Sequence, residues 1–294
     1  MTRYDHFIRL VLLIGLVLAG LILTSMVSAA LMLASGFTIN DIMDMAQTGS
    51  MGLGAGLTRA MLASQHLCFF ILPALAFGLI VYRSAFLSGL DLQKNPGAIL
   101  SGLGIVFLIA AYPIVNLSFI ANEAIPLPEW ALQFENQAED TLKAILTMDT
   151  PMILLINMLI IGILPGIGEE LIFRGILQKQ IGLMLKSPVL AIWIAAFIFS
   201  AIHLQFEGFL PRMVLGAILG YLYHWTGNLW VPIIAHAFNN GVQVIMIYAT
   251  GIDLSSLDQQ SSDQLKWWMV PLSLVVMYFI YTVIKKNREP IEQA

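Results

Sequence analysis

The sequence predicts an all-α, polytopic membrane protein, and three observations lead to this fold class. The chain has 294 residues, of which 59% are hydrophobic and only 11% are charged. A soluble domain has about 25% charged residues and cannot bury so large an apolar fraction. The apolar residues also form runs of about 20, the length needed to cross roughly 30 Å of hydrocarbon. We therefore expect a single transmembrane domain over residues 1–294.

The apolar runs predict about eight transmembrane helices. The first run follows Arg3 and Arg9 and continues to about Leu33. This is too long for the apolar core of a cleavable signal peptide, so the run is expected to be a retained span. The sixth run is the shortest of the set. The runs cover residues 8–34, 61–82, 98–121, 151–173, 188–205, 211–225, 229–249 and 267–284.

The positions of the basic residues predict the orientation in the membrane. If the N-terminus lies inside, ten of the 14 Lys and Arg residues fall in inner segments, in agreement with the positive-inside rule. We expect a multi-pass protein of a bacterial cytoplasmic membrane with both termini inside. The net charge of −4 is small, and no nucleic-acid partner is expected. Cys68 is the only cysteine, so no intrachain disulfide can form.

Two connections between the predicted spans are long and polar. In residues 122–150, Trp130, Leu132, Phe134 and Leu142 are spaced loosely like one face of a helix, with acidic residues among them. This pattern favours an amphipathic helix on the outer membrane surface, with an ordinary solvated loop as the alternative. The second connection, residues 250–266, is rich in Ser and Asp and is expected to be exposed.

Glu169 and Glu170 lie in one of the most apolar stretches of the chain. A carboxylate at membrane depth costs several kcal/mol and marks a functional site by default. Glu170 and Arg174 are four residues apart and can pair on one helix face. Glu169 then lacks a local partner, and a carboxylate removed from water can act as a general base. The alternative is that both glutamates are anchors at the cytoplasmic end of the span.

Polar residues also interrupt two later spans. His203 lies in the fifth span, where a lone histidine is more often a packing or hydrogen-bonding residue. In the seventh span His236 and Asn240 are four apart and share a helix face. An imidazole and an amide on one face can both donate to one oxygen, as an oxyanion hole requires. His6 and His66 are interpreted as unremarkable surface or span-end residues.

Together these clusters resemble the three motifs of the CPBP family, the CAAX-protease and bacteriocin-processing (Abi) intramembrane proteases. The matching positions are Glu169, Glu170 and Arg174, then Phe199 and His203, then His236 and Asn240. The similarity covers roughly residues 150–250, which we therefore interpret as a CPBP/Abi-like catalytic core. No motif supports the first three spans or the last one.

The resemblance implies an eight-helix core with a polar catalytic cavity among the fourth, fifth and seventh helices, opening to the cytoplasm. It implies that Glu169 is the general base and that His203 helps to hold the water. His236 and Asn240 would stabilise the tetrahedral oxyanion. Glu170, Arg174 and Phe199 would have supporting roles.

The sequence favours catalysis without a cofactor, although the family has long been called a metalloprotease family. The chain has no His-Glu-x-x-His zinc helix. Zinc remains the alternative, with Glu169, His203 and His236 as ligands, because three protein ligands plus water are typical of a catalytic zinc site.

The predicted function is an intramembrane endopeptidase that hydrolyses a peptide bond of a membrane-associated protein or peptide near the cytoplasmic face. Its partners would be the lipid bilayer and this substrate, and neither the substrate's identity nor the oligomeric state follows from the sequence. A proton-coupled transporter is one alternative, with the glutamates and histidines as a proton relay. A non-catalytic scaffold or bacteriocin-immunity protein is another.

The depths of the three clusters lead to a structural expectation. At 1.5 Å per residue, Glu169 lies about 27 Å along a helix that starts at Pro151, whereas His203 lies about 22 Å from Pro188. The clusters can meet only if the helices extend beyond the apolar region. Residues 175–187 are amphipathic, and we expect them to prolong the fourth helix.

Overall fold

Helices form all the regular structure in the part of the chain that the computed structural model describes, residues 2–48, 53–251 and 265–287. No strand occurs in these ranges, and the predicted all-α class is confirmed. Most of the predicted polar connection 250–266 lies outside them. The elements are α1 (Arg3–Ala34), α2 (Ile39–Thr48), α3 (Ala55–Gln65), η1 (His66–Ile71), α4 (Leu72–Tyr82), η2 (Arg83–Ala85), α5 (Phe86–Gly89), α6 (Gly97–Glu123), α7 (Glu129–Leu146), α8 (Pro151–Asn157), η3 (Met158–Ile163), α9 (Leu164–Glu170), η4 (Leu171–Gln178), α10 (Lys179–Leu185), α11 (Pro188–Ala201), α12 (Phe209–Thr226), α13 (Trp230–Thr250) and α15 (Met269–Asn287).

Six helical segments within the described ranges are long and apolar enough to cross a membrane. Two of them, Ala55–Gly89 and Pro151–Leu185, have 35 residues each and join several of these elements. The fifth and sixth predicted spans form α11, with 14 residues, and α12, with 18 residues. They are helical but are not among the six. At 1.5 Å per residue, α11 is only about 21 Å long and is shorter than the hydrocarbon layer.

The predicted extension of the fourth helix is confirmed. Helical structure continues through η4 and α10 to Leu185, and Lys186 then adopts a left-handed conformation with φ 55°. Ser187 begins the next helix, because its hydroxyl accepts a hydrogen bond from the Leu190 N–H. The connection between the fourth and fifth predicted spans is therefore only a tight turn.

Wide π-helical turns interrupt the two longest segments, and two of these turns have a cause in the sequence. The turns η1 and η3 end two residues before Pro73 and Pro165, respectively. Proline has no N–H, and its ring clashes with the carbonyl four residues earlier in an α-helix. A wider turn relieves this conflict, and such turns occur frequently at functional sites.

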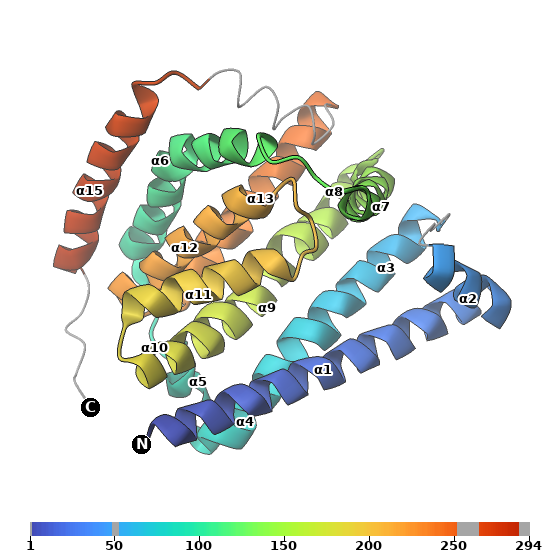
Figure 1. The fold of residues 1–294 in the computed structure, drawn as a ribbon, viewed down its shortest axis with the longest axis horizontal. Coiled ribbons are helices and arrows are strands. Elements are labelled where there is room, and N and C mark those ends of the chain that lie inside the picture. Colours follow the sequence, from blue (N-terminus) through green and yellow to red (C-terminus); the bar gives the residue numbers. More distant parts are fainter. Residues whose placement is uncertain (1, 49–52, 252–264, 288–294) are drawn as a thin grey trace.

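The Pro151–Leu185 segment lies in the middle of the bundle, with α1 and α3 on one side and α11 and α13 on the other (Figure 1). Small residues allow this central position. A Cβ atom on Gly166 would lie 3.0 Å from the Ala237 nitrogen, so glycine lets α9 approach the backbone of α13. Gly216 and Gly220 likewise face the α11 side chains of Phe199 and Ile192.

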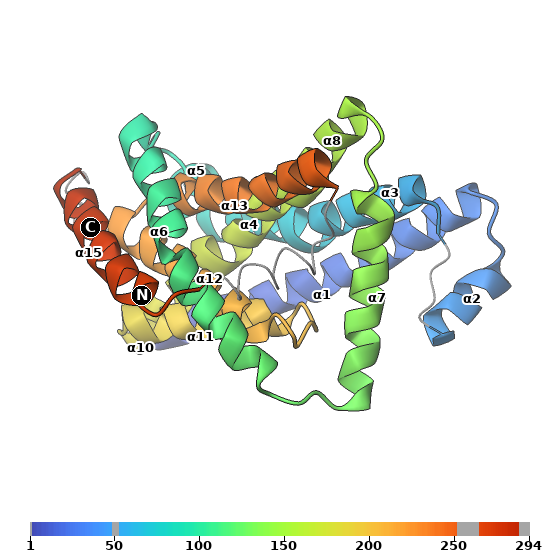
Figure 2. The same cartoon turned by 90° about the horizontal axis from the view of Figure 1, so that it is seen from above.

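The helix α7 crosses the bundle instead of running along it. Figure 2 shows α7 nearly perpendicular to α1 and α13. The amphipathic-helix interpretation of residues 122–150 is thus confirmed over the solvated-loop alternative. Trp130 and Phe134 are exposed, whereas Ala131 and Ile145 are buried against the bundle. At its far end α7 is bound to α3, because Arg59 donates to the Ile145 carbonyl at 2.7 Å.

The start of α1 and the end of α15 lie at the same end of the bundle (Figure 1). The end of α10 lies there too, since His6 Nδ1 is 2.8 Å from Gln180 Oε1. His6 lies at the start of α1, so its interpretation as a span-end residue holds, whereas a surface position is wrong because the side chain is buried. The first and the last described helix ends therefore lie at one end of the bundle.

Candidate active site

The two adjacent glutamates lie at the end of α9 and are both buried, with exposed fractions of 5% for Glu169 and 0% for Glu170. Glycine at 168 allows a second helix to pack against this point. A Cβ atom on Gly168 would lie only 2.9 Å from the Phe70 Cβ in η1. The glutamates are therefore enclosed between η1 and α13, instead of facing lipid or the end of a span as anchors would.

Glu170 and Arg174 form the predicted ion pair. The Arg174 NH1 group lies 2.6 Å from Glu170 Oε1, and both side chains are almost completely buried. Arg174 also donates from NH2 to the Gly216 carbonyl at 2.7 Å, which joins the pair to α12. A buried ion pair needs further hydrogen bonds to its remaining polar atoms. The Gly216 carbonyl supplies one for Arg174, whereas Glu170 Oε2 is buried without a hydrogen-bond partner among the described residues.

His236 lies between the two glutamates. Its Nδ1 atom is 2.8 Å from Glu170 Oε1, and its Nε2 atom is 3.9 Å from Glu169 Oε2. Because Glu170 is paired with Arg174 and acts as an acceptor, Nδ1 carries the hydrogen of the shorter contact. The distance between His236 Nε2 and Glu169 Oε2 is too long for a hydrogen bond. Among the described residues no side chain hydrogen-bonds to Glu169, so Glu170 is the bound carboxylate and Glu169 is the free one.

Asn240 lies one turn beyond His236 on α13, as predicted. Its Nδ2 group donates to the Ile161 carbonyl at 3.2 Å, in the π-helical turn η3, and its Oδ1 atom accepts from Asn239 at 3.2 Å. The amide has two hydrogens, and this contact with η3 uses one of them. Asn240 is therefore held in place by its neighbours on both sides.

The sequence predicted that His203 lies within the fifth span, and this prediction was wrong. The helix α11 ends at Ala201, and His203 belongs to the loop of residues 202–208 that leads to α12. Its Nδ1 atom lies 2.7 Å from the Phe199 carbonyl. Since a carbonyl can only accept, Nδ1 carries a hydrogen and Nε2 of the neutral ring is left as an acceptor.

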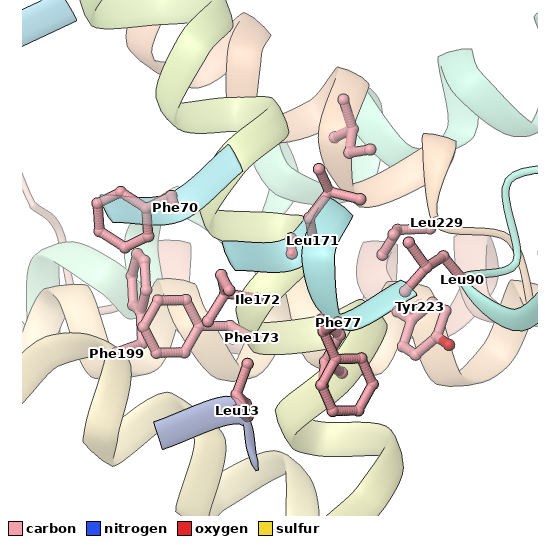
Figure 3. Packing of buried hydrophobic residues seen from close by; sticks show 13 residues of the cluster. Leu13, Phe70, Phe77, Leu90, Leu171, Ile172, Phe173, Phe199, Tyr223 and Leu229 are labelled. Carbon is pink, nitrogen blue, oxygen red and sulfur yellow. The ribbon is translucent and has the colours of Figure 1, made fainter. Parts of the chain in front are cut away.

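Phe199 brings the predicted residues together. Its ring centroid is 5.1 Å from that of His203 and 6.1 Å from that of His236. The Arg174 guanidinium lies 4.9 Å from the same ring. Figure 3 shows Phe199 beside Phe173 within the buried cluster. Arg174, His203 and His236, one residue from each of the three motifs, thus lie around one aromatic side chain.

One residue near this site was misinterpreted from the sequence. The interpretation of His66 as an unremarkable surface or span-end residue is wrong, because its exposed fraction is only 8% and it lies within the Ala55–Gly89 segment. Its backbone carbonyl lies 3.6 Å from the position of a Cβ atom on Gly168. No periodic pattern points to it. The only sequence signal is a polar group, Ser64 to His66, inside an otherwise apolar segment.

The geometry does not support the zinc alternative with Glu169, His203 and His236 as ligands. In the described part of the chain, no three His, Cys, Asp or Glu side chains are close enough together to hold a metal ion. The nearest approach among the three proposed ligands that the structure records is the 3.9 Å contact between His236 and Glu169.

Comparison with known proteins identifies the central part of this arrangement. Residues 151–242 match the family described as "Type II CAAX prenyl endopeptidase Rce1-like". This similarity is confined to residues 151–242, which are less than half of the chain. The Rce1-like segment contains all seven motif residues, from Glu169 to Asn240, whereas His66 and α7 lie outside it.

A curated relative supports the same region. The uncharacterized protein YpbD of Bacillus subtilis (strain 168) is 37% identical over 84 residues, which are 27% of this chain and 40% of YpbD. The alignment thus spans less than half of either protein. No solved structure matches this chain.

Proposed function

We propose that this chain is an intramembrane endopeptidase that hydrolyses a peptide bond of a membrane-associated protein or peptide. The observation that carries the proposal is the asymmetry of the two buried glutamates in the Rce1-like segment. Glu170 is bound by Arg174 and His236, while Glu169 has no hydrogen-bonding side chain among the described residues. A buried carboxylate that is free to exchange a proton suits a general base.

In the proposed reaction, Glu169 removes a proton from a water molecule whose oxygen forms a bond to the substrate carbonyl carbon. His203 helps to orient this water through Nε2, the nitrogen left as an acceptor by its contact with the Phe199 carbonyl. When the C–N bond breaks, Glu169 returns the proton to the leaving nitrogen. Each proton is thus accounted for without a further reactant.

The negative charge on the substrate oxygen needs donors that are already in place. Asn240 has a second amide hydrogen in addition to the one bound to Ile161. His236 can donate from Nε2 in its doubly protonated form, because Glu170 already accepts the hydrogen on Nδ1. We propose that these two groups form the oxyanion hole and that the ion pair of Glu170 and Arg174 keeps His236 in position.

The site is proposed to open toward the cytoplasm. His236 lies only about 9 Å along α13 from Trp230, at 1.5 Å per residue. The distribution of Lys and Arg favours a cytoplasmic location for the chain ends and for the start of α13. A peptide at the inner surface of a bacterial cytoplasmic membrane would then reach Glu169. The family suggests a prenylated CAAX peptide as a first probe.

The test is cleavage of a quenched fluorescent peptide, ending in a farnesylated CAAX sequence, by the purified protein in liposomes. Glu169→Gln should lower kcat by about 10²–10⁴-fold, the usual contribution of a general base, with no loss of thermal stability. Activity should survive exhaustive chelation, because the proposed steps use only protein groups. A matched control is Glu139→Gln, in an exposed pair with Lys143 on α7, which should leave cleavage unchanged.

The same liposomes distinguish the other functions. Proton flux that depends on Glu169, without cleavage of farnesylated or unmodified membrane peptides, would replace the peptidase with a transporter. Full cleavage by Glu169→Gln would overturn the assignment of the general base. Loss of activity with chelator, restored by zinc, would overturn metal-free catalysis.

A further inference from the structure

His66 is placed next to the proposed general base by close backbone packing. It begins the π-helical turn η1, and its carbonyl lies 3.6 Å from the position of a Cβ atom on Gly168, the residue before Glu169. Any side chain at 168 would collide with the Phe70 Cβ at 2.9 Å. The approach of η1 to α9 therefore depends on glycine at this position.

The His66 ring belongs to the aromatic group that surrounds the site. It stacks on Phe70, with centroids 5.9 Å apart and planes at 26°. Phe70 contacts Phe173, which in turn contacts Phe199 (Figure 3). Both motif histidines, His203 and His236, contact the Phe199 ring. The His66 side chain is buried, with an exposed fraction of only 8%. It therefore faces the site and not the lipid.

The Nδ1 atom of His66 is buried and has no hydrogen-bond partner among the described residues. The other buried histidines differ in this respect. His6 Nδ1 contacts Gln180 and His236 Nδ1 contacts Glu170, both at 2.8 Å. A buried polar atom without a partner costs free energy and calls for an explanation, which is often a functional one.

We propose that His66 is a substrate-positioning group of this active site, and that Nδ1 hydrogen-bonds the main chain of the bound peptide beside the scissile bond. A peptide backbone offers both N–H and C=O groups, so it can satisfy Nδ1 in either tautomer of the ring. Such a contact is independent of the substrate's side chains. The proposal deepens the proposed peptidase function and adds to it a residue from outside the Rce1-like segment.

Three substitutions at position 66 test the proposal in the liposome assay. Phenylalanine retains the stacking on Phe70 but cannot hydrogen-bond. Asparagine places a polar atom near the position of Nδ1, whereas glutamine places one near Nε2. His66→Phe should raise KM about 10-fold, the effect expected for one lost hydrogen bond, and His66→Asn should recover most of this loss. His66→Gln should recover little.

Thermal stability separates substrate binding from a structural role. His66→Phe removes a buried polar atom that has no partner in the free protein, so its Tm should equal or exceed that of the wild type. The control is His6→Phe, which removes the contact with Gln180 and should lower Tm without changing KM. A lowered Tm for His66→Phe with unchanged KM would show that His66 is only a packing residue.

Binding of the uncleaved farnesylated peptide, measured by fluorescence anisotropy in a Glu169→Gln background, keeps the test independent of catalysis. Adding His66→Phe should weaken this binding about 10-fold. Equal binding with and without the substitution would overturn the role of His66. Absence of cleavage by the wild-type protein would instead count against the proposed function.

Discussion

At the scale of single residues, Arg174 controls the state of the site. Its guanidinium pairs with Glu170, donates to the Gly216 carbonyl and lies over the Phe199 ring. Glu170, held by Arg174, accepts the Nδ1 hydrogen of His236. The orientation of His236 toward Glu169 therefore depends on a residue that need not touch the substrate.

This dependence gives a prediction for Arg174→Met. The substitution keeps most of the side-chain volume but leaves Glu170 as a buried carboxylate without its cation. Breaking one partner of a buried pair costs about 3–5 kcal/mol, so Tm should fall strongly and cleavage should be lost.

The measurement is thermal unfolding in detergent, followed by tryptophan fluorescence. The control is Lys143→Met, which removes an exposed i,i+4 pair worth only about 0.3–0.5 kcal/mol and should leave Tm nearly unchanged. Equal stability of the two variants would show that the Glu170–Arg174 pair does not hold the site.

At the scale of elements, α7 secures the loop of residues 202–208 that carries His203. One carboxylate oxygen of Glu135 accepts hydrogen bonds from the backbone N–H groups of Phe206 and Glu207. The Trp130 ring also meets Phe206 edge to face, with centroids 5.1 Å apart. The crossing helix is therefore joined to a loop of the proposed site, although it lies outside the Rce1-like segment.

Glu135→Ala should loosen this loop. Glu135 is a partly exposed acceptor of two hydrogen bonds, so its loss should lower the free energy of local opening of the loop by about 1 kcal/mol. This corresponds to an increase of about fivefold in the rate of amide exchange. Hydrogen exchange of the Phe206 and Glu207 amides should rise, and cleavage should fall by a similar factor. Glu139→Ala on the same helix is the matched control, since its side chain pairs with Lys143 instead. Unchanged exchange in Glu135→Ala would contradict the role of α7.

At the scale of the whole molecule, the start of α1 and the end of α15 lie at the same end of the bundle (Figure 1), and this arrangement predicts the orientation of the chain in the membrane. The basic residues predict that this end faces the cytoplasm. The Ile145 carbonyl of α7 accepts hydrogen bonds from Arg59 of α3 and Asn157 of α8. These contacts lie away from the end of the bundle that holds the chain ends, so α7 would then lie outside the cell membrane.

Cysteine labelling checks this orientation. In a Cys68→Ser background, we expect an impermeant maleimide added to intact cells to modify Gln137→Cys on α7. Asn287→Cys at the end of α15 should react only after the cells are opened. Both original side chains are exposed, so either cysteine can be reached from its own side of the membrane. The reverse pattern would place the chain ends outside and turn the proposed site away from the cytoplasm.

Much of the fold was predictable because it depends on local properties. Each of the eight predicted apolar runs is largely helical, although only six segments of the described chain are long and apolar enough to cross a membrane. The amphipathic pattern of residues 175–187 predicted the extension of the fourth helix. The spacing of Glu170 and Arg174 predicted their pair for the same reason, since residues four apart on a helix are neighbours. The exact end of α11 was not predictable, because residues 202–208 are held by groups from α6, α7 and α12.

The sequence alone therefore determined the class of the protein, its helices, and which polar side chains share a helix face. Only the tertiary structure decided that His236 binds Glu170, that Phe199 joins both motif histidines, and that the misinterpreted His66 lies beside Gly168. The physical reason is the distance along the chain over which the deciding interactions act. Helix formation and membrane insertion depend on neighbours within a few turns, whereas these contacts join helices far apart in the chain and depend on how glycines let their backbones approach.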